Sequence, residues 1–157
     1  MEKLKVLKGQ YETLARQYKL PGFKELNEEF EIEKIAEKET ELLLRQVRRC
    51  ILEKIVAVSR FFELMLNPTE ANLMILSMIK EVNAETKKKM EKIYRELSYI
   101  EITAVELDLD YSEKTEAKFI LNVTKDWKKL KEALKGISRQ LEMKLSVKDK
   151  FFDGYFG

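Results

Sequence analysis

The stretch that decides the fold is residues 31–66, which reads EIEKIAEKETELLLRQVRRCILEKIVAVSRFFELML. It contains neither Pro nor Gly, and apolar residues line one side of it when it is drawn as a helix. The apolar positions are Ile32, Ile35, Leu43, Val47, Ile51, Ile55, Val58, Phe62 and Met65. The pattern therefore predicts one long helix over about 31–66.

The segments on either side also carry helical signals. Asn67-Pro68-Thr69-Glu70 is typical of a helix start, and a second long helix is expected over about 68–104, with an interruption near Asn83 where the apolar register shifts. A helical stripe also occupies residues 2–19 and ends before Pro21-Gly22. We expect an all-α antiparallel bundle of four to five helices in a single domain over 1–157, with a small C-terminal subdomain at 104–157 as a variant.

Residues 104–124 allow two interpretations. Residues 105–111 alternate as a half-buried strand does, residues 118–124 are rich in β-formers, and residues 112–116 would then be the turn of a β-hairpin. Against this, the turn lacks Gly, Asn and Pro, and helical spacing continues through Ala104 and Leu107. Asp110 and Glu113 would make a capping box for a further helix. The helix is our main prediction, and the hairpin is the alternative.

The composition argues against most catalytic chemistry. The 157 residues include no His and one Cys, and the five Gly form no phosphate-binding loop. Ser77 and Lys80 match a Ser-x-x-Lys spacing without its companion motifs, and the start of a calcium loop at Asp108 lacks the required Gly and Glu. We expect no cofactor and no enzymatic activity. A carboxylate-bound metal enzyme is the remaining catalytic alternative, through Glu101, Glu106, Asp108 and Asp110.

The charges are balanced in number but uneven along the chain. The chain contains 30 Lys and Arg and 28 Asp and Glu. Lys and Glu number 23 each, whereas Asn and Gln together number nine, and this resembles the composition of hyperthermophilic proteins. Two basic clusters are candidates for contact with nucleic-acid phosphates, because Arg and Lys bind phosphate and an interleaved aromatic can stack on a base. They consist of Lys87, Lys88, Lys89, Lys92 and Arg95, and of Arg45, Arg48 and Arg49.

The C-terminal end is aromatic and punctuated by glycine. Phe151, Phe152, Tyr155 and Phe156 can either fold back over the core or dock into a partner protein, where buried aromatics concentrate binding energy. Partner docking makes these four residues candidate contact residues.

These observations favour a non-catalytic intracellular protein. The N-terminus lacks the features of a secretory signal, and the apolar stretches are too short or too often interrupted by charge to span a bilayer, so we expect a cytoplasmic location without membrane contact. Cys50 lies among apolar residues and is expected to be buried. The main functional prediction is a helical scaffold or protein-interaction subunit that self-associates or binds a protein partner. The alternative is an accessory subunit of a nucleic-acid-processing complex that binds the phosphate backbone through its basic clusters.

Overall fold

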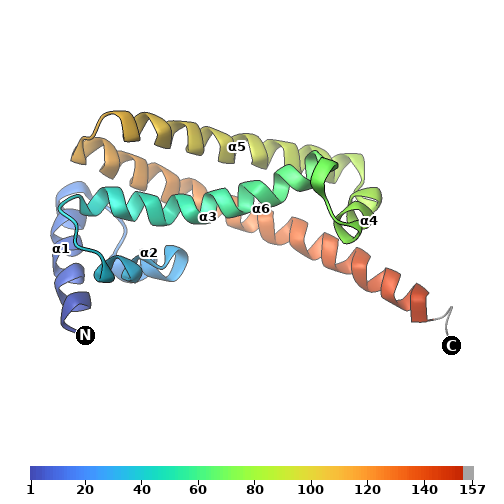
Figure 1. Cartoon of the computed structure of the whole chain (residues 1–157), viewed down its shortest axis with the longest axis horizontal. Coiled ribbons are helices and arrows are strands. Elements are labelled where there is room, and N and C mark those ends of the chain that lie inside the picture. Colours follow the sequence, from blue (N-terminus) through green and yellow to red (C-terminus); the bar gives the residue numbers. More distant parts are fainter. Residues whose placement is uncertain (154–157) are drawn as a thin grey trace. The chain divides into compact units, whose positions relative to one another are not determined.

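In a computed structural model of the chain, the backbone is described over residues 1–153 and the side chains over residues 1–69 and 71–143. Every regular element of that backbone is helical, so the all-α prediction is confirmed (Figure 1). The α-helices are α1 (Glu2–Tyr18), α2 (Phe23–Phe30), α3 (Leu43–Leu66), α4 (Leu73–Glu81), α5 (Ala84–Leu109) and α6 (Glu113–Asp153). Two short 3-10 helices accompany them, η1 (Ile32–Glu37) and η2 (Pro68–Glu70).

The chain divides into two compact units. Unit 1 combines Met1–Ala57 with Tyr99–Trp127, and unit 2 combines Val58–Ser98 with the stretch that begins at Lys128. Helices α3, α5 and α6 each supply residues to both units. The single domain expected over 1–157, and the subdomain at 104–157, stay predictions.

Unit 1 is built around the N-terminal helices and the aromatic residues that they bury. α1, α2 and η1 contact one another. Tyr11 on α1 is fully buried, its ring meets the Phe23 ring edge-on at 5.9 Å, and its hydroxyl donates to the Pro21 carbonyl at 2.7 Å. Trp127 on α6 packs against Phe30 with the ring centroids 5.6 Å apart, and its indole Nε1 donates to Glu29 at 2.9 Å. Both buried polar groups are thus hydrogen-bonded, as burial requires.

Unit 2 has an apolar core to which separate stretches of the chain contribute. Met78 on α4, Leu97 on α5 and Phe62 on α3 are each at least nine-tenths buried. Leu130, Ile137 and Leu141 bury the facing side of α6. The spacing of these α6 residues at seven and four positions is that of one helical face, which explains why this stretch was recognisable as helical.

The long helix expected over 31–66 is shorter than predicted, because α3 begins at Leu43. Glu31 ends α2 in the left-handed conformation with φ 54°. The Asn27 side chain then accepts a hydrogen bond from the Glu33 backbone N–H at 2.8 Å and donates to the Glu33 carboxylate at 3.1 Å. The Thr40 hydroxyl accepts from the Leu42 N–H at 3.1 Å. Such side-chain bonds compete with helical hydrogen bonds, so η1 and a non-helical link replace the first part of the predicted helix.

The helix expected over 68–104 is divided in two. Asn72 is the N-cap of α4, where its side chain accepts from the Ile75 N–H at 3.0 Å, and Asn83 accepts from the Thr86 N–H at 2.7 Å at the start of α5. Asn67, by contrast, makes no capping bond with its side chain. The interruption near Asn83 is therefore confirmed, while the predicted helix start at Asn67 yields only η2.

The alternative β-hairpin at 104–124 is not supported. Residues 105–109 continue α5, and residues 113–124 belong to α6, so only residues 110–112 lie between the two helices. Ile120, Val123 and Trp127 are buried on one helical face, and so the β-branched residues of this segment serve a helix. α6 also begins well before the start near Asp126 that the strongest apolar pattern indicates.

A proline substitution distinguishes the helix from the hairpin in solution. Lys118 is exposed in the interior of α6. We expect Lys118→Pro to lower the free energy of unfolding by roughly 3 kcal/mol, because proline removes a helical hydrogen bond and clashes with the preceding turn. Urea unfolding monitored by circular dichroism measures this, with Lys118→Ala as the control that leaves stability unchanged or raised. Equal stability of the two variants would contradict the helix.

Candidate interaction surfaces

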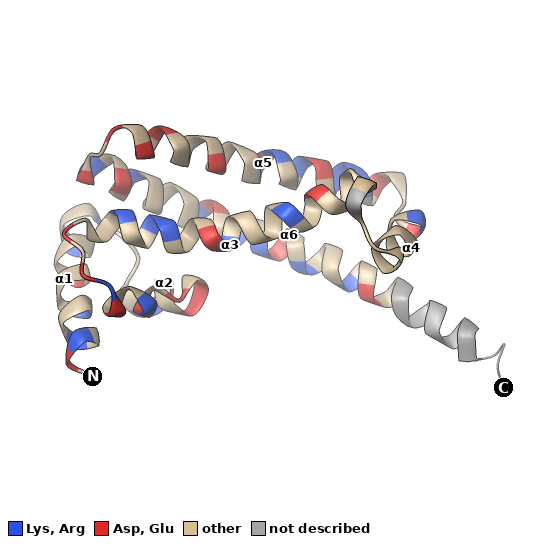
Figure 2. Cartoon of the chain, viewed as in Figure 1, with Lys and Arg blue, Asp and Glu red and all other residues tan. Residues whose placement is uncertain are grey.

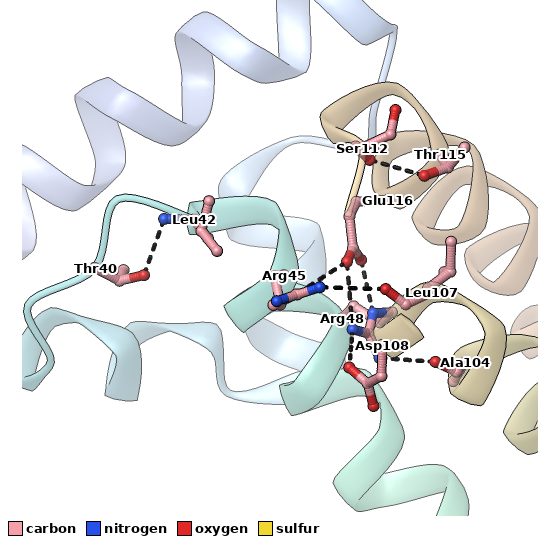
Figure 3. A network of polar contacts seen from close by, with 10 residues as sticks. All are labelled: Thr40, Leu42, Arg45, Arg48, Ala104, Leu107, Asp108, Ser112, Thr115 and Glu116. Atoms are coloured by element: carbon pink, nitrogen blue, oxygen red, sulfur yellow. Dashed lines mark hydrogen bonds and ion pairs between the residues drawn. The ribbon is translucent and has the colours of Figure 1, made fainter. Parts of the chain in front are cut away.

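Four charged side chains of unit 1 form a cluster, here called the clasp: Arg45 and Arg48 from α3, Asp108 from α5 and Glu116 from α6 (Figure 3). Arg48 Nε donates to Glu116 Oε2 at 2.6 Å, and Arg48 Nη2 donates to Asp108 Oδ1 at 2.6 Å and to Glu116 Oε1 at 3.3 Å. The side chains of Arg48 and Glu116 are both 0% exposed. Each therefore supplies the opposite charge that the other needs in the interior.

The clasp also binds the backbone at the end of α5. Arg45 Nη2 donates to the Leu107 carbonyl at 3.2 Å, and Arg48 Nη1 donates to the Ala104 carbonyl at 3.4 Å. These carbonyls lie near the C-terminus of α5, where cations are favourable, while Glu116 lies in the first turn of α6, where an anion is favourable. The clasp thus uses the dipoles of both helices at their junction.

The hydrogen bonds of the clasp shift the pKa values of Arg48 and Asp108. Burial disfavours the Arg48 charge, but the hydrogen bonds to Glu116 and Asp108 outweigh it and raise the pKa of Arg48. The hydrogen bond from Arg48 lowers the pKa of Asp108 below its usual value. Both shifts favour the charged forms, so Arg48 and Asp108 form an ion pair at neutral pH.

The clasp changes the interpretation of the predicted basic cluster at residues 45–49. Arg48 is buried, and Arg45 lies with its guanidinium 5.0 Å from the Tyr111 ring centroid and only 18% of its side chain exposed. Arg49 is exposed. The three arginines therefore do not share one exposed surface on which a phosphate backbone could lie. Two of them hold α3 to α5 and α6 instead.

An exposed apolar surface lies on the C-terminal part of α5. We call it the α5 stripe, and it consists of Tyr99, Ile102, Val105 and Leu109, whose side chains are between 60% and 78% exposed. Their spacing of three, three and four residues places them on one helical face. Leu97, Ile100 and Ala104 are buried on another face of the same helix. α5 is thus apolar on two faces, of which the fold covers only one.

Carboxylates surround the α5 stripe. No Lys or Arg occurs between Arg95 and Lys114, whereas six acidic residues fall in that interval. Glu106 and Asp110 are exposed and Glu101 is half-buried. In Figure 2 the ribbon of this part of α5 carries the red of acidic residues and no blue, whereas blue segments of basic residues lie nearer its beginning. The stripe is therefore an acidic amphipathic surface.

The predicted basic cluster at residues 87–95 is exposed throughout. Its members all lie on α5 within unit 2: Lys87, Lys88, Lys89, Lys92 and Arg95. Lys89 pairs with Glu85 at 3.4 Å on the surface, a contact of small energetic weight. The structure thus brings all five side chains to the surface of one helix.

A groove of about 490 Å³ runs between α5 and α6 within unit 2, and we call it the unit 2 groove. Ile93, Leu130 and Ile137 line it, together with Ala133 and Gly136 of α6. A Cβ added to Gly136 would meet no atom within 4 Å. The groove therefore has open space at Gly136. Lys89, Lys92 and Lys129 contribute three cations to its lining, and Glu96 one anion.

Other predicted sites have different outcomes. Cys50 is buried as expected, and burial raises the pKa of its thiol. Across the residues with described side chains, no three His, Cys, Asp or Glu gather closely enough to hold a metal ion. Within the same part of the chain, no helix has the length and apolar character to cross a membrane. Of the aromatic end, the side chains of Phe151 and Phe152 and all of Tyr155 and Phe156 lie outside the described residues.

Sequence reasoning missed the clasp and the α5 stripe. Glu116 falls in the turn of the alternative hairpin, and Arg48 was assigned to phosphate contact, so nothing local indicated that they pair. The alternation of residues 105–111 favours the alternative strand, and the predicted helix was not inspected for a second apolar face. A signal in the sequence could have found the stripe. The helical pattern has apolar residues on two faces, within a stretch that contains no Lys or Arg.

Comparison with protein-family models, with curated proteins and with solved structures found no match for this chain.

The clasp makes a sharp prediction for stability. Arg48→Met leaves Glu116 charged and buried without its main partner, and we expect the free energy of unfolding to fall by about 3–5 kcal/mol. The double variant Arg48→Met, Glu116→Gln removes that buried charge as well and should regain part of the loss. Urea unfolding of the two single variants and the double variant gives the coupling energy. Strictly additive effects would contradict a direct interaction in the interior.

Proposed function

We propose that this protein is a non-catalytic helical scaffold that self-associates through the α5 stripe. The observation that carries the proposal is the row of four exposed apolar side chains on a well-formed helix of unit 1. Single exposed apolar residues are ordinary, but a contiguous row on one helical face favours a protein contact, because covering it removes apolar area from water. The aromatic ring of Tyr99 suits such a contact, since tyrosine is enriched where interfaces concentrate their energy.

The chemistry of the chain supports a non-catalytic function. It has no His to serve as a general base. Its only thiol belongs to Cys50, which is buried and has a raised pKa, the opposite of a reactive thiolate. Among the described side chains, the buried charges of Arg48 and Glu116 neutralise each other, and Arg48 also contacts a carbonyl at the end of α5. A scaffold needs these properties and no others.

Charging the stripe tests the proposal. Ile102→Lys with Val105→Lys should weaken self-association at least tenfold, because each buried aliphatic side chain is worth about 1.5–3 kcal/mol and the new charges would be desolvated. Sedimentation velocity over a range of concentrations measures this. The control is Val6→Lys, which charges an exposed apolar residue on α1. A wild-type chain that stays monomeric at every concentration would overturn the proposal.

A second candidate function is binding of nucleic-acid phosphates, as an accessory subunit of a larger complex. It is favoured by the five exposed bases of α5 at residues 87–95, which share one helix with the partly exposed ring of Tyr94. Phosphates are held by such cations, and each contact releases counterions from the nucleic acid. The weakness of this candidate is the pair Glu85 and Glu91, which dilute the positive charge of the same segment.

Oligonucleotide binding tests this second candidate directly. We expect any binding of a fluorescent single-stranded DNA to weaken steeply between about 50 and 200 mM salt. Lys87→Glu, Lys88→Glu, Lys89→Glu should abolish it. The matched control, Lys3→Glu, Lys5→Glu, Lys114→Glu, makes the same change in net charge at exposed lysines elsewhere. Equal binding by the two triple variants, measured by fluorescence anisotropy, would exclude a specific role for the 87–95 cluster.

A further inference from the structure

We propose that the α5 stripe of one copy docks on the unit 2 groove of a second copy. This inference rests on the proposed self-association and specifies which two surfaces meet. The stripe belongs to unit 1 and the groove to unit 2, and each chain therefore carries both halves of the contact. The two surfaces are complementary in charge, in polarity and in shape.

Charge decides against the simplest alternative, in which two stripes pair with each other. Glu101, Glu106 and Asp110 lie beside the stripe, with no basic side chain of the same segment between them. Pairing stripe with stripe would bring the carboxylates of the two copies close together. Their like charges would then repel each other. The groove instead presents Lys89, Lys92 and Lys129. Opposite charges then meet at the rim of the contact, where they steer association and select the partner surface.

The polarity and relief of the groove also suit the stripe. Ile93, Leu130 and Ile137 form an apolar base, and the missing side chain at Gly136 leaves open space above it. A space of about 490 Å³ cannot hold a whole helix, but it can take the aliphatic side chains that project from one. Ile102 and Val105 at the centre of the stripe are such side chains. A nucleic acid would satisfy the lysines but would bring no aliphatic groups for this base.

The order of charges along α5 supports an intermolecular role. Residues 84–95 carry five bases and two acids, whereas residues 96–109 carry four acids and no base. The helix dipole favours the reverse order, with acids at the N-terminus and bases at the C-terminus. The stability of α5 itself therefore does not explain the arrangement. A contact in which the acidic half meets a lysine-lined surface does explain it.

The contact joins two different surfaces, which is a heterologous association. Such contacts close into rings when the rotation between copies allows it and otherwise continue as open chains. In both cases a copy with a damaged stripe keeps an intact groove, and a copy with a damaged groove keeps an intact stripe. Mixing the two restores one productive contact, and this property separates the proposal from any pairing of like surfaces.

The experiment uses two full-length variants. The stripe variant is Ile102→Lys, Val105→Lys, and the groove variant is Gly136→Leu, which fills the open space. Gly9→Leu is the matched control, because Gly9 is also an exposed helical glycine with no atom within 4 Å of an added Cβ, and it lies on α1 away from the groove. Sedimentation velocity should find each variant at least tenfold weaker in self-association, and an equimolar mixture should form a heterodimer. Gly9→Leu should associate like the wild type.

The other outcomes each point elsewhere. A groove variant that associates like the wild type, beside a stripe variant that does not, would overturn this inference and leave the proposed function standing. A mixture that stays monomeric would also overturn this inference, because the intact stripe of one variant would then fail to bind the intact groove of the other. If Gly136→Leu lost the native circular dichroism, Lys89→Glu with Lys129→Glu would replace it. A groove variant that lost only oligonucleotide binding would assign the groove to nucleic acid and overturn the inference.

Discussion

The rest of unit 1 depends on the single positive charge of Arg48, which lies in the interior between two carboxylates from other helices. A buried guanidinium without partners would be prohibitive, so α3, α5 and α6 must approach in the one register that brings Asp108 and Glu116 to it. Apolar packing alone tolerates small shifts along a helix axis, whereas hydrogen bonds of 2.6 Å do not. The clasp therefore contributes to the choice of arrangement more than to the total stability.

The same constraint sets the exposure of the α5 stripe. α5 has apolar residues on two faces, and either face could in principle turn inward. Because Asp108 and the Ala104 carbonyl are held by Arg48, the face with Ile100 and Ala104 is fixed toward the core. Tyr99, Ile102, Val105 and Leu109 are consequently left outside. An interior ion pair thus determines which apolar face of α5 stays exposed.

Much of the helical architecture was predictable from the sequence, because helical periodicity is a local property. The apolar spacing of α1 and of the later part of α6 needed no tertiary information. The predicted helix boundaries were wrong where hydrogen bonds of single polar side chains set them. Asn27 makes such a bond before η1, and Asn72 makes one before α4. The clasp was out of reach for a different reason. Arg48 and Glu116 are 68 residues apart, and no local pattern shows which arginine will find which glutamate.

Because Cys50 is buried, its thiol can report on local opening of the folded chain. An exposed thiolate attacks electrophilic thiol reagents. The thiol of Cys50, the only one in the chain, is buried, and burial raises its pKa. It can react only when α3 moves away from the core of unit 1. The rate of labelling in the native state therefore measures how often that unit opens. This labelling experiment requires no engineered cysteine. It reports on unit 1 alone, although the two units share three helices.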